Sequence, residues 1–384
     1  MNPQDFRAKD AGRVIQALGG YWAFVPAPLP PKLSYDDELV LVLSQADAAL
    51  NELSELGRHL PNPHLLIAPY IRREAVLSSR IEGTTATLRD LLLDEATDGA
   101  GTEVPADVGE VRNYVRAMEY GVTRLKDLPL SLRLVRELHE RLMRGGRGDR
   151  ATPGEFRRSQ NWIGIQGSTL ATATYVPPPP EEMMACLDAW ERFLHVRDQL
   201  PHLIQCALIH EQFEAIHPFL DGNGRVGRLL IALFLVERLR LSQPLLYLSA
   251  YIDAHRGEYY ARLQTVRTDG DWIGWLRFFL AGVLETAQQG VRQAGELTAI
   301  RERFRKRLHD KPRALALLEA LFANPYLSVA RAAKLLKVSL PTARQAVRVL
   351  QESGMLEEVS GRRWGRLYLA RPILRALEGP RAKT

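Results

Sequence analysis

The sequence of 384 residues predicts a mainly α-helical protein. Apolar residues recur at the three-to-four-residue spacing of amphipathic helices through most of the chain, whereas the strict alternation that is typical of strands is scarce. Clusters of glycine and proline separate these periodic segments. The length favours two or three domains, and a hydrophobic content of 46% is ordinary for a protein with a packed core.

The first helices are predicted from their start and stop signals. Ser34, which precedes two aspartates, is expected to cap the first helix. Gly83 is expected to end a second helix that begins near residue 63 and kinks at Pro69. The segment 94–105 is polar and contains glycine, so we expect a loop there. The apolar face of the first helix is expected to comprise Leu39, Leu41, Leu43, Ala46, Leu50 and Leu53.

The middle of the chain is also predicted to be helical. Residues 161–176 look extended, because threonine and tyrosine alternate there with small residues, and we expect a small β-hairpin. The run 229–236 is apolar on every face, which indicates a central, buried helix. Other helices are expected at 108–125, 131–143, 181–196 and 203–216, with more up to about residue 293.

The last domain has a different charge. Residues 301–384 contain 19 Lys and Arg but 7 Asp and Glu, a balance of +12, which leaves −6 for the rest of the chain. This asymmetry favours contact with a polyanion, although a solubilising surface is the alternative. Helices are expected at 301–308, 313–322, 328–336 and 341–351, followed by a hairpin of 355–359 and 366–369. This order resembles a winged helix-turn-helix domain.

We therefore expect a helical N-terminal region over residues 1–108, a core over 109–295 and a third domain over 296–384. No apolar run approaches the roughly 20 residues of a membrane helix, and the charged N-terminus is unlike a secretory signal. We expect a cytoplasmic protein without a membrane partner. Cys186 and Cys206 have no metal-type spacing and are expected to be reduced and buried.

The most informative stretch reads His-Pro-Phe-Leu-Asp-Gly-Asn-Gly-Arg-Val-Gly-Arg and spans residues 217–228. A glycine-rich turn that enters a helix binds phosphate, because backbone N–H groups can approach it closely. Arg225 and Arg228 share a face of the first turn, where they oppose the helix dipole unless an anion neutralises them. Asp221 can bind Mg²⁺, and His217 can accept a proton. Each feature alone has a structural explanation, but their combination favours a phosphate site.

This stretch resembles the active-site motif of the Fic (filamentation induced by cAMP) family, His-Pro-Phe-x-Asp-Gly-Asn-Gly-Arg-x-x-Arg, at every defining position. The resemblance covers roughly residues 35–285 and implies a Fic-type helical core that transfers AMP from ATP to a Ser, Thr or Tyr hydroxyl of a target protein or of itself. Supporting similarity is found at Asn113-Tyr114, at residues 153–157 and 160–164, at Tyr259-Tyr260 and at Asp271-Trp272.

The resemblance also implies roles for single residues. His217 would deprotonate the target hydroxyl, Asp221 would hold Mg²⁺, and Asn223 and Arg228 would complete the catalytic group. Residues 165–176 would form a flap that pairs with the target backbone by strand addition, with a plain edge hairpin as the alternative. Nucleotide contacts are expected from Gly222, Asn223, Gly224, Arg225, Val226, Gly227, Arg228 and Tyr251.

A second motif, Ser-Ser-Arg-Ile-Glu-Gly, spans residues 78–83. Glu82 falls at a helix C-terminus, where its charge opposes the dipole at a cost of up to about 1 kcal/mol, so we expect a compensating partner. A solvated helix end is the alternative. The stretch resembles the Fic inhibitory motif, which implies that Glu82, with Ser78 on the same face and Gly83 after it, pairs with Arg228 in place of the γ-phosphate.

The third domain offers candidate DNA contacts. They are Thr342, Arg344, Gln345 and Arg348 on one helix face, and Arg362, Arg363 and Arg366 at the hairpin tip. A protein-interaction or dimerisation module is the alternative. Two functions stay open: a protein adenylyltransferase autoinhibited in cis, or a DNA-binding transcription regulator with a nucleotide-sensing core. Transfer of phosphate, phosphocholine or another nucleotide is a narrower alternative, and the sequence leaves a homodimer open.

Overall fold

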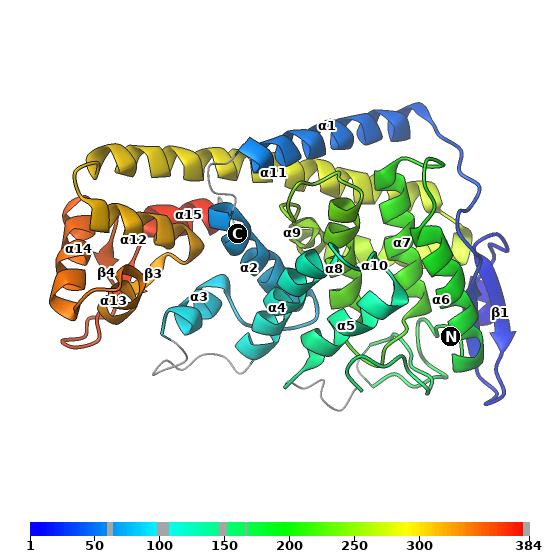
Figure 1. The fold of residues 1–384 in the computed structure, drawn as a ribbon. Helices are drawn as coiled ribbons and strands as arrows, with labels where there is room; N and C mark the ends of the chain where they lie inside the picture. Colours follow the sequence, from blue (N-terminus) through cyan, green and yellow to red (C-terminus); the bar gives the residue numbers. More distant parts are fainter. Residues whose placement is uncertain (60–63, 98–106, 146–151, 166, 379–384) are drawn as a thin grey trace.

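The computed structural model is mainly α-helical, as predicted, and describes residues 1–59, 64–97, 107–145, 152–165 and 167–378 (Figure 1). The N-terminal part consists of η1 (Pro3–Asp5), β1 (Gly12–Gln16), β2 (Trp22–Pro26), α1 (Asp37–His59), α2 (His64–Ile81) and α3 (Leu88–Ala96). The middle consists of α4 (Val108–Arg124), α5 (Leu132–Met143), α6 (Pro180–Leu194), α7 (His202–Ile216), α8 (Asn223–Glu237), α9 (Leu248–Ala254) and α10 (Arg256–Asp269). The remainder consists of α11 (Trp272–Arg307), α12 (Pro312–Ala323), β3 (Tyr326–Ser328), α13 (Val329–Leu336), α14 (Leu340–Glu352), β4 (Glu357–Glu358), β5 (Leu367–Leu369) and α15 (Arg371–Glu378).

Three predictions for the N-terminal helices need correction. Asp36 rather than Ser34 caps α1, because its carboxylate accepts the backbone N–H of Leu39 at 2.9 Å. Leu41 is exposed, since two residues after the buried Leu39 it has turned to the outer side of the helix. The first three residues of the expected 94–105 loop belong to α3, and the loop's residues 98–105 lie outside the described residues. A capping box between Thr87 and Asp90 starts α3.

The predicted central helix is α8, which is buried on nearly all sides. It packs against α7, α4, α5 and α2 (Figure 1). The predicted helices that became α4, α5, α6 and α7 are present with ends within about two residues of expectation. The expected end of the second helix is also present: α2 contains Pro69 and stops before Gly83, whose φ is +92°.

The expected hairpin at residues 161–176 is reduced to one bridge, between Ile163 and Tyr175. Turns and bends replace strand between them. Thr172 Oγ1 accepts the backbone N–H of Thr169 and contacts its hydroxyl, and the Trp162 indole donates to Ser168 O. An unpredicted N-terminal hairpin, β1 paired antiparallel with β2, supports this segment. Phe24 N–H donates to Val176 O at 2.9 Å, and the Phe24 ring contacts Tyr175.

The C-terminal part begins without a break in the helix. α11 runs for 36 residues through the expected boundary at residue 296, and its last turns are the segment 301–308 that the sequence suggests as a separate helix. Beyond it, the three expected helices and the hairpin are present as α12, α13, α14 and the pair β4–β5. β3, which makes the sheet order β3-β5-β4, and α15 were not predicted.

Two further expectations concern membrane-spanning helices and thiols. Among the described helices, none combines the length and apolarity that crossing a bilayer would need. Cys186 and Cys206 are free and buried, as expected, and burial raises the pKa of the Cys186 thiol to about 11.

Candidate active site

The glycine-rich turn forms the start of α8. Gly222 is the N-cap residue with φ +80°, and no side chain caps the helix. The first N–H groups of a helix lack intrahelical partners, so those of the Asn223–Arg225 turn are available to an anion. A Cβ atom at Gly222 would lie 2.7 Å from the Met143 sulfur, and one at Gly224 would lie 2.3 Å from a Glu82 oxygen. The left-handed φ favours glycine at residue 222, and a side chain at residue 224 would have to displace the Glu82 carboxylate.

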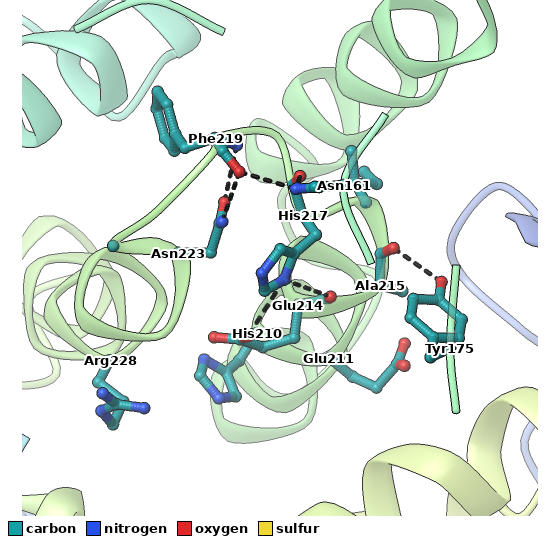
Figure 2. A network of polar contacts seen from close by, with 12 residues as sticks. Asn161, Tyr175, His210, Glu211, Glu214, Ala215, His217, Phe219, Asn223 and Arg228 are labelled. Atoms are coloured by element: carbon teal, nitrogen blue, oxygen red, sulfur yellow. Dashed lines mark hydrogen bonds and ion pairs between the residues drawn. The ribbon is translucent and has the colours of Figure 1, made fainter. Parts of the chain in front are cut away.

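His217 is placed by the end of α7. It is the C-cap residue and adopts a left-handed conformation with φ +49°, which is costly for a residue with a side chain. Its ring Nδ1 lies 3.3 Å from the backbone oxygen of Glu214 (Figure 2). Since a carbonyl only accepts, Nδ1 carries the proton and Nε2 is left as the base. Burial, with Arg267 and Arg157 nearby, lowers the pKa of His217 to about 4, so the ring is neutral at pH 7.

Arg228 is held by both residues of the upstream motif. Its guanidinium donates from Nε to Ser78 Oγ at 2.9 Å, and from Nη2 to Ser78 O at 3.0 Å and Glu82 Oε1 at 2.6 Å. The Arg228 side chain is 1% exposed and that of Glu82 36%. Burial is the largest single influence on the pKa of Glu82 and would raise it. The charge and the hydrogen bond of Arg228, together with nearby Arg225 and His217, lower that pKa overall. The predicted ion pair is therefore present in the structure.

A cavity of about 590 Å³ joins these groups. His217, Glu82, Gly224 and Arg228 line one part of it. The other walls come from the segment 162–175, from α10 and from Glu214. The residues of the segment and of α10 that line the cavity are Trp162, Ile163, Gly164, Ile165, Thr174, Tyr175, Tyr259, Tyr260, Leu263, Gln264 and Arg267. The cavity thus brings a base, a cation and a helix N-terminus together.

Several residues predicted to contact a nucleotide lie outside this lining. Arg225 points toward α4, where it pairs with Glu110 at 3.1 Å. Both ends of the Asn223 amide bond to Phe219 backbone at 2.8 Å, so this side chain fixes the loop (Figure 2). Val226 is a core residue, and Tyr251 packs on His255 and Phe278. Asp221, Gly222 and Gly227 also lie beyond the lining.

Asp221 is the one predicted metal ligand. Its side chain is 55% exposed, and its Oδ1 lies 3.6 Å from Arg225 Nη2. No group of three or more His, Cys, Asp or Glu in the described residues could hold a metal by itself. Mg²⁺ in nucleotide sites commonly takes one or two carboxylates, with phosphate oxygens and water completing its shell. A single exposed carboxylate beside an anion cradle fits that kind of site.

The structure adds residues that the motif did not indicate. Arg157 is 2% exposed and donates to His217 O at 3.0 Å, and Asn161 Nδ2 donates to His217 O and Phe219 O at 3.1 and 2.8 Å. These two side chains fix the loop that carries His217. Glu214 is buried, which raises its pKa to about 7, and its Oε2 lies 4.0 Å from His217 Nδ1. Spacing alone could have suggested only Glu214, which is one helical turn before His217.

The candidate DNA-contacting residues lie apart from this site. Arg344, Gln345 and Arg348 are exposed on α14, while Thr342 is half-buried, and Arg348 pairs with Glu352 at 2.8 Å. The opposite, apolar face of the helix, with Ala343, Val347 and Leu350, is buried. Arg362, Arg363 and Arg366 are exposed between β4 and β5, with Trp364 78% exposed among them.

Comparison with known proteins matches two consecutive parts of the chain to models of the same family. Residues 40–123 match the Fic/DOC family N-terminal model, and residues 129–235 match the Fic/DOC family model. A Drosophila erecta protein named protein adenylyltransferase Fic is 31% identical over 206 residues, which are 52% of this chain and 37% of that protein. The Drosophila melanogaster protein of the same name is 30% identical over 205 residues, with 52% and 37% covered.

A solved structure of a Fic family protein from Desulfovibrio desulfuricans has the same fold. It is 22% identical with a TM-score of 0.58, and the match covers 89% of this chain and 98% of that one. The chain spans less than two fifths of the length of the curated relatives that it matches. With both family models matched in order, the part of the chain from residue 40 to residue 235 belongs to the Fic/DOC family.

Proposed function

We propose that this protein is an adenylyltransferase that transfers AMP from ATP to a hydroxyl group of a protein, either a target or itself, and that Glu82 inhibits it in cis. The observation that carries the proposal is the cavity in which His217, the start of α8 and Arg228 meet. The curated relatives named protein adenylyltransferase Fic support the reaction class.

The proposed chemistry needs a base, an anion cradle and a positioned acceptor. Nε2 of His217 takes the proton from the acceptor hydroxyl, whose oxygen attacks the α-phosphorus, and pyrophosphate leaves. Free N–H groups at the start of α8 and the guanidinium of Arg228 stabilise the charge on the phosphates. Asp221 would hold Mg²⁺, which would neutralise part of the phosphate charge. Arg157 and Asn161 keep the His217 loop in position.

The proposed inhibition follows from competition for Arg228. A Glu82 oxygen lies 2.6 Å from Arg228 Nη2 and 2.3 Å from where a Gly224 Cβ would be. A carboxylate in that place occupies the anion cradle, so a phosphate group and Glu82 cannot bind there together. ATP would then bind either weakly or with its phosphates displaced, and transfer would be slow.

The experiment compares wild type, Glu82→Gly and Glu82→Gly with His217→Ala. Each is incubated with ATP labelled at the α-phosphate, Mg²⁺ and a cell lysate. We expect label in protein to rise at least tenfold in Glu82→Gly and to vanish in the double variant, with mass spectrometry giving a mass of AMP on a Ser, Thr or Tyr. Unchanged labelling in Glu82→Gly would refute the inhibition. Label from a γ-labelled but not an α-labelled nucleotide would refute AMP as the transferred group.

We infer DNA binding as a second function, of the C-terminal part of the chain. The exposed arginines of α14 and of the β4–β5 turn, with Trp364 between them, support it. In a plot of the logarithm of the DNA-binding constant against the logarithm of the salt concentration, the slope should be about −0.9 per phosphate contacted. Arg362→Ala with Arg363→Ala should reduce that slope by about two. Absence of binding to any duplex at low salt would favour the alternative of a protein-interaction module.

A further inference from the structure

The C-terminal end of α3 is capped by side chains from the C-terminal part of the chain. The last four carbonyl groups of a helix have no intrahelical partners, and one of them, on Glu95, accepts a hydrogen bond from Arg331 of α13. A cation at a helix C-terminus is also electrostatically favourable. Asn324, which is 5% exposed, donates from Nδ2 to Leu92 O at 2.9 Å.

The same contacts extend to α2. Both oxygens of the Glu95 carboxylate accept hydrogen bonds from Arg72 Nε, at 2.9 and 2.8 Å. One of these oxygens also lies 3.4 Å from Asn324 Nδ2. The side chains of Arg72 and Glu95 are 15% and 18% exposed, so water screens their ion pair only partly. α2 packs against α12 and α15 as well as against α8 and α4 (Figure 1). α2 is therefore enclosed between the C-terminal part and the core.

The other end of α2 is the inhibitory end. Ser78 and Glu82 hold Arg228 there, and only residues 82–87 separate α2 from α3. This connection is short and is itself fixed, because Asp107 accepts the N–H groups of Thr85 and Ala86. A displacement that carries the end of α2 away from Arg228 must therefore move α3. Movement of α3 breaks its bonds to Asn324 and Arg331.

We propose that residues 312–378 act as an internal clamp that holds the inhibitory helix α2 on the active site through Asn324 and Arg331. The inference rests on the proposed function and names a device that regulates it. Weakening the clamp raises the fraction of molecules in which α2 has left Arg228, and the rate of transfer rises with that fraction. The residues of the clamp lie outside the cavity and contact no catalytic group.

The test uses Arg331→Ala and Asn324→Ala, singly and together, in the full chain. Losing one such hydrogen bond should raise AMP incorporation about three- to tenfold, and losing both should raise it further. Arg331→Lys keeps a donor and should stay near wild type. Arg313→Ala, an exposed change at the start of α12, serves as the control. In a Glu82→Gly background the clamp variants should add nothing, because the inhibitory charge is already gone.

Amide hydrogen exchange over residues 64–87 provides a readout that does not depend on the reaction. The clamp predicts faster exchange there in Arg331→Ala than in wild type or Arg313→Ala. Wild-type exchange and wild-type incorporation in the double clamp variant, with Glu82→Gly active, would overturn the clamp. If Glu82→Gly transfers no AMP, the proposed function fails, and the exchange result alone decides the clamp. Activity of Glu82→Gly combined with Arg331→Ala shows that the clamp variant still folds.

Discussion

Replacing Glu82 with glutamine removes the charge that faces Arg228 but keeps the size of the side chain. Arg228 is 1% exposed, and Nη2 donates to Glu82 at 2.6 Å, so the variant leaves a buried guanidinium without its counter-charge. Removing one partner of a buried pair costs about 3–5 kcal/mol. Glu82 is 36% exposed and therefore partly screened by water, so we expect a smaller loss of about 2–3 kcal/mol in the free energy of unfolding.

The loss should disappear when another anion binds Arg228. Thermal unfolding of wild type and Glu82→Gln is followed without ligand and then with saturating triphosphate and Mg²⁺. Without ligand the variant should melt several degrees lower. A ligand at 100 times its Kd adds about 2.7 kcal/mol, and wild type gains less because Glu82 must first be displaced. Equal melting without ligand, or equal stabilisation of both proteins by triphosphate, would refute the competition for Arg228.

The pH dependence of this difference has a definite sign. The pKa of Glu82 is lowered in the folded protein from its usual 4.5: burial would raise it, but the charge and hydrogen bond of Arg228, together with nearby Arg225 and His217, lower it overall. The carboxylate therefore contributes stability above pH 4.5, and this contribution is lost as the pH falls through the lower folded value. The gap between wild type and Glu82→Gln should be full at pH 7 and close on acidification. A gap that widens below pH 4.5 would contradict the assignment.

Two further predictions concern the reacting groups. Because the pKa of His217 is lowered to about 4, the rate of transfer by Glu82→Gly should stay constant as the pH falls to about 5. A pH–rate profile with a half-maximal rate near pH 6.5 would argue against a neutral buried base. If a limb appears near pH 7 and is absent from Glu214→Gln, the titrating group is Glu214. Gly224→Ala places a Cβ 2.9 Å from Arg228 Nη1 and should weaken ATP binding at least tenfold by calorimetry, whereas Gly257→Ala has open space around it and should bind as wild type does.

Sequence spacing predicted the pieces of the site better than their partners. His217, Gly224, Arg228 and Glu82 come together as the motifs indicate. Arg225 and Arg228 share a helix face, so spacing alone assigned both to the phosphates. Their side chains diverge because Glu110 of α4 lies beside one and Ser78 of α2 beside the other. Helix packing decides which neighbour a side chain contacts, and helix packing cannot be predicted from the local sequence.

The fold shows the same division between local and distant information. The helices with strong apolar periodicity were predicted, whereas β1 and β2 were missed because their apolar residues do not alternate strictly. The predicted boundary at residue 296 rests on a change in charge. Charge says nothing about where a helix ends, and with no proline between residues 244 and 312, α11 continues through it. The separate helix expected at 301–308 is therefore the last part of α11.

Two kinds of release can be distinguished at Arg228. The guanidinium bonds to Ser78 through both the hydroxyl and the backbone oxygen, besides its bond to Glu82. A rotation of the Glu82 side chain would vacate the anion cradle and leave both Ser78 bonds intact, so α2 would stay in place. Displacement of α2 breaks all three bonds and also strains the contacts of α3 with Asn324 and Arg331. Only the second route is opposed by the C-terminal clamp. Release that Arg331→Ala accelerates is therefore release by helix displacement, and release that it leaves unchanged is rotation of a side chain.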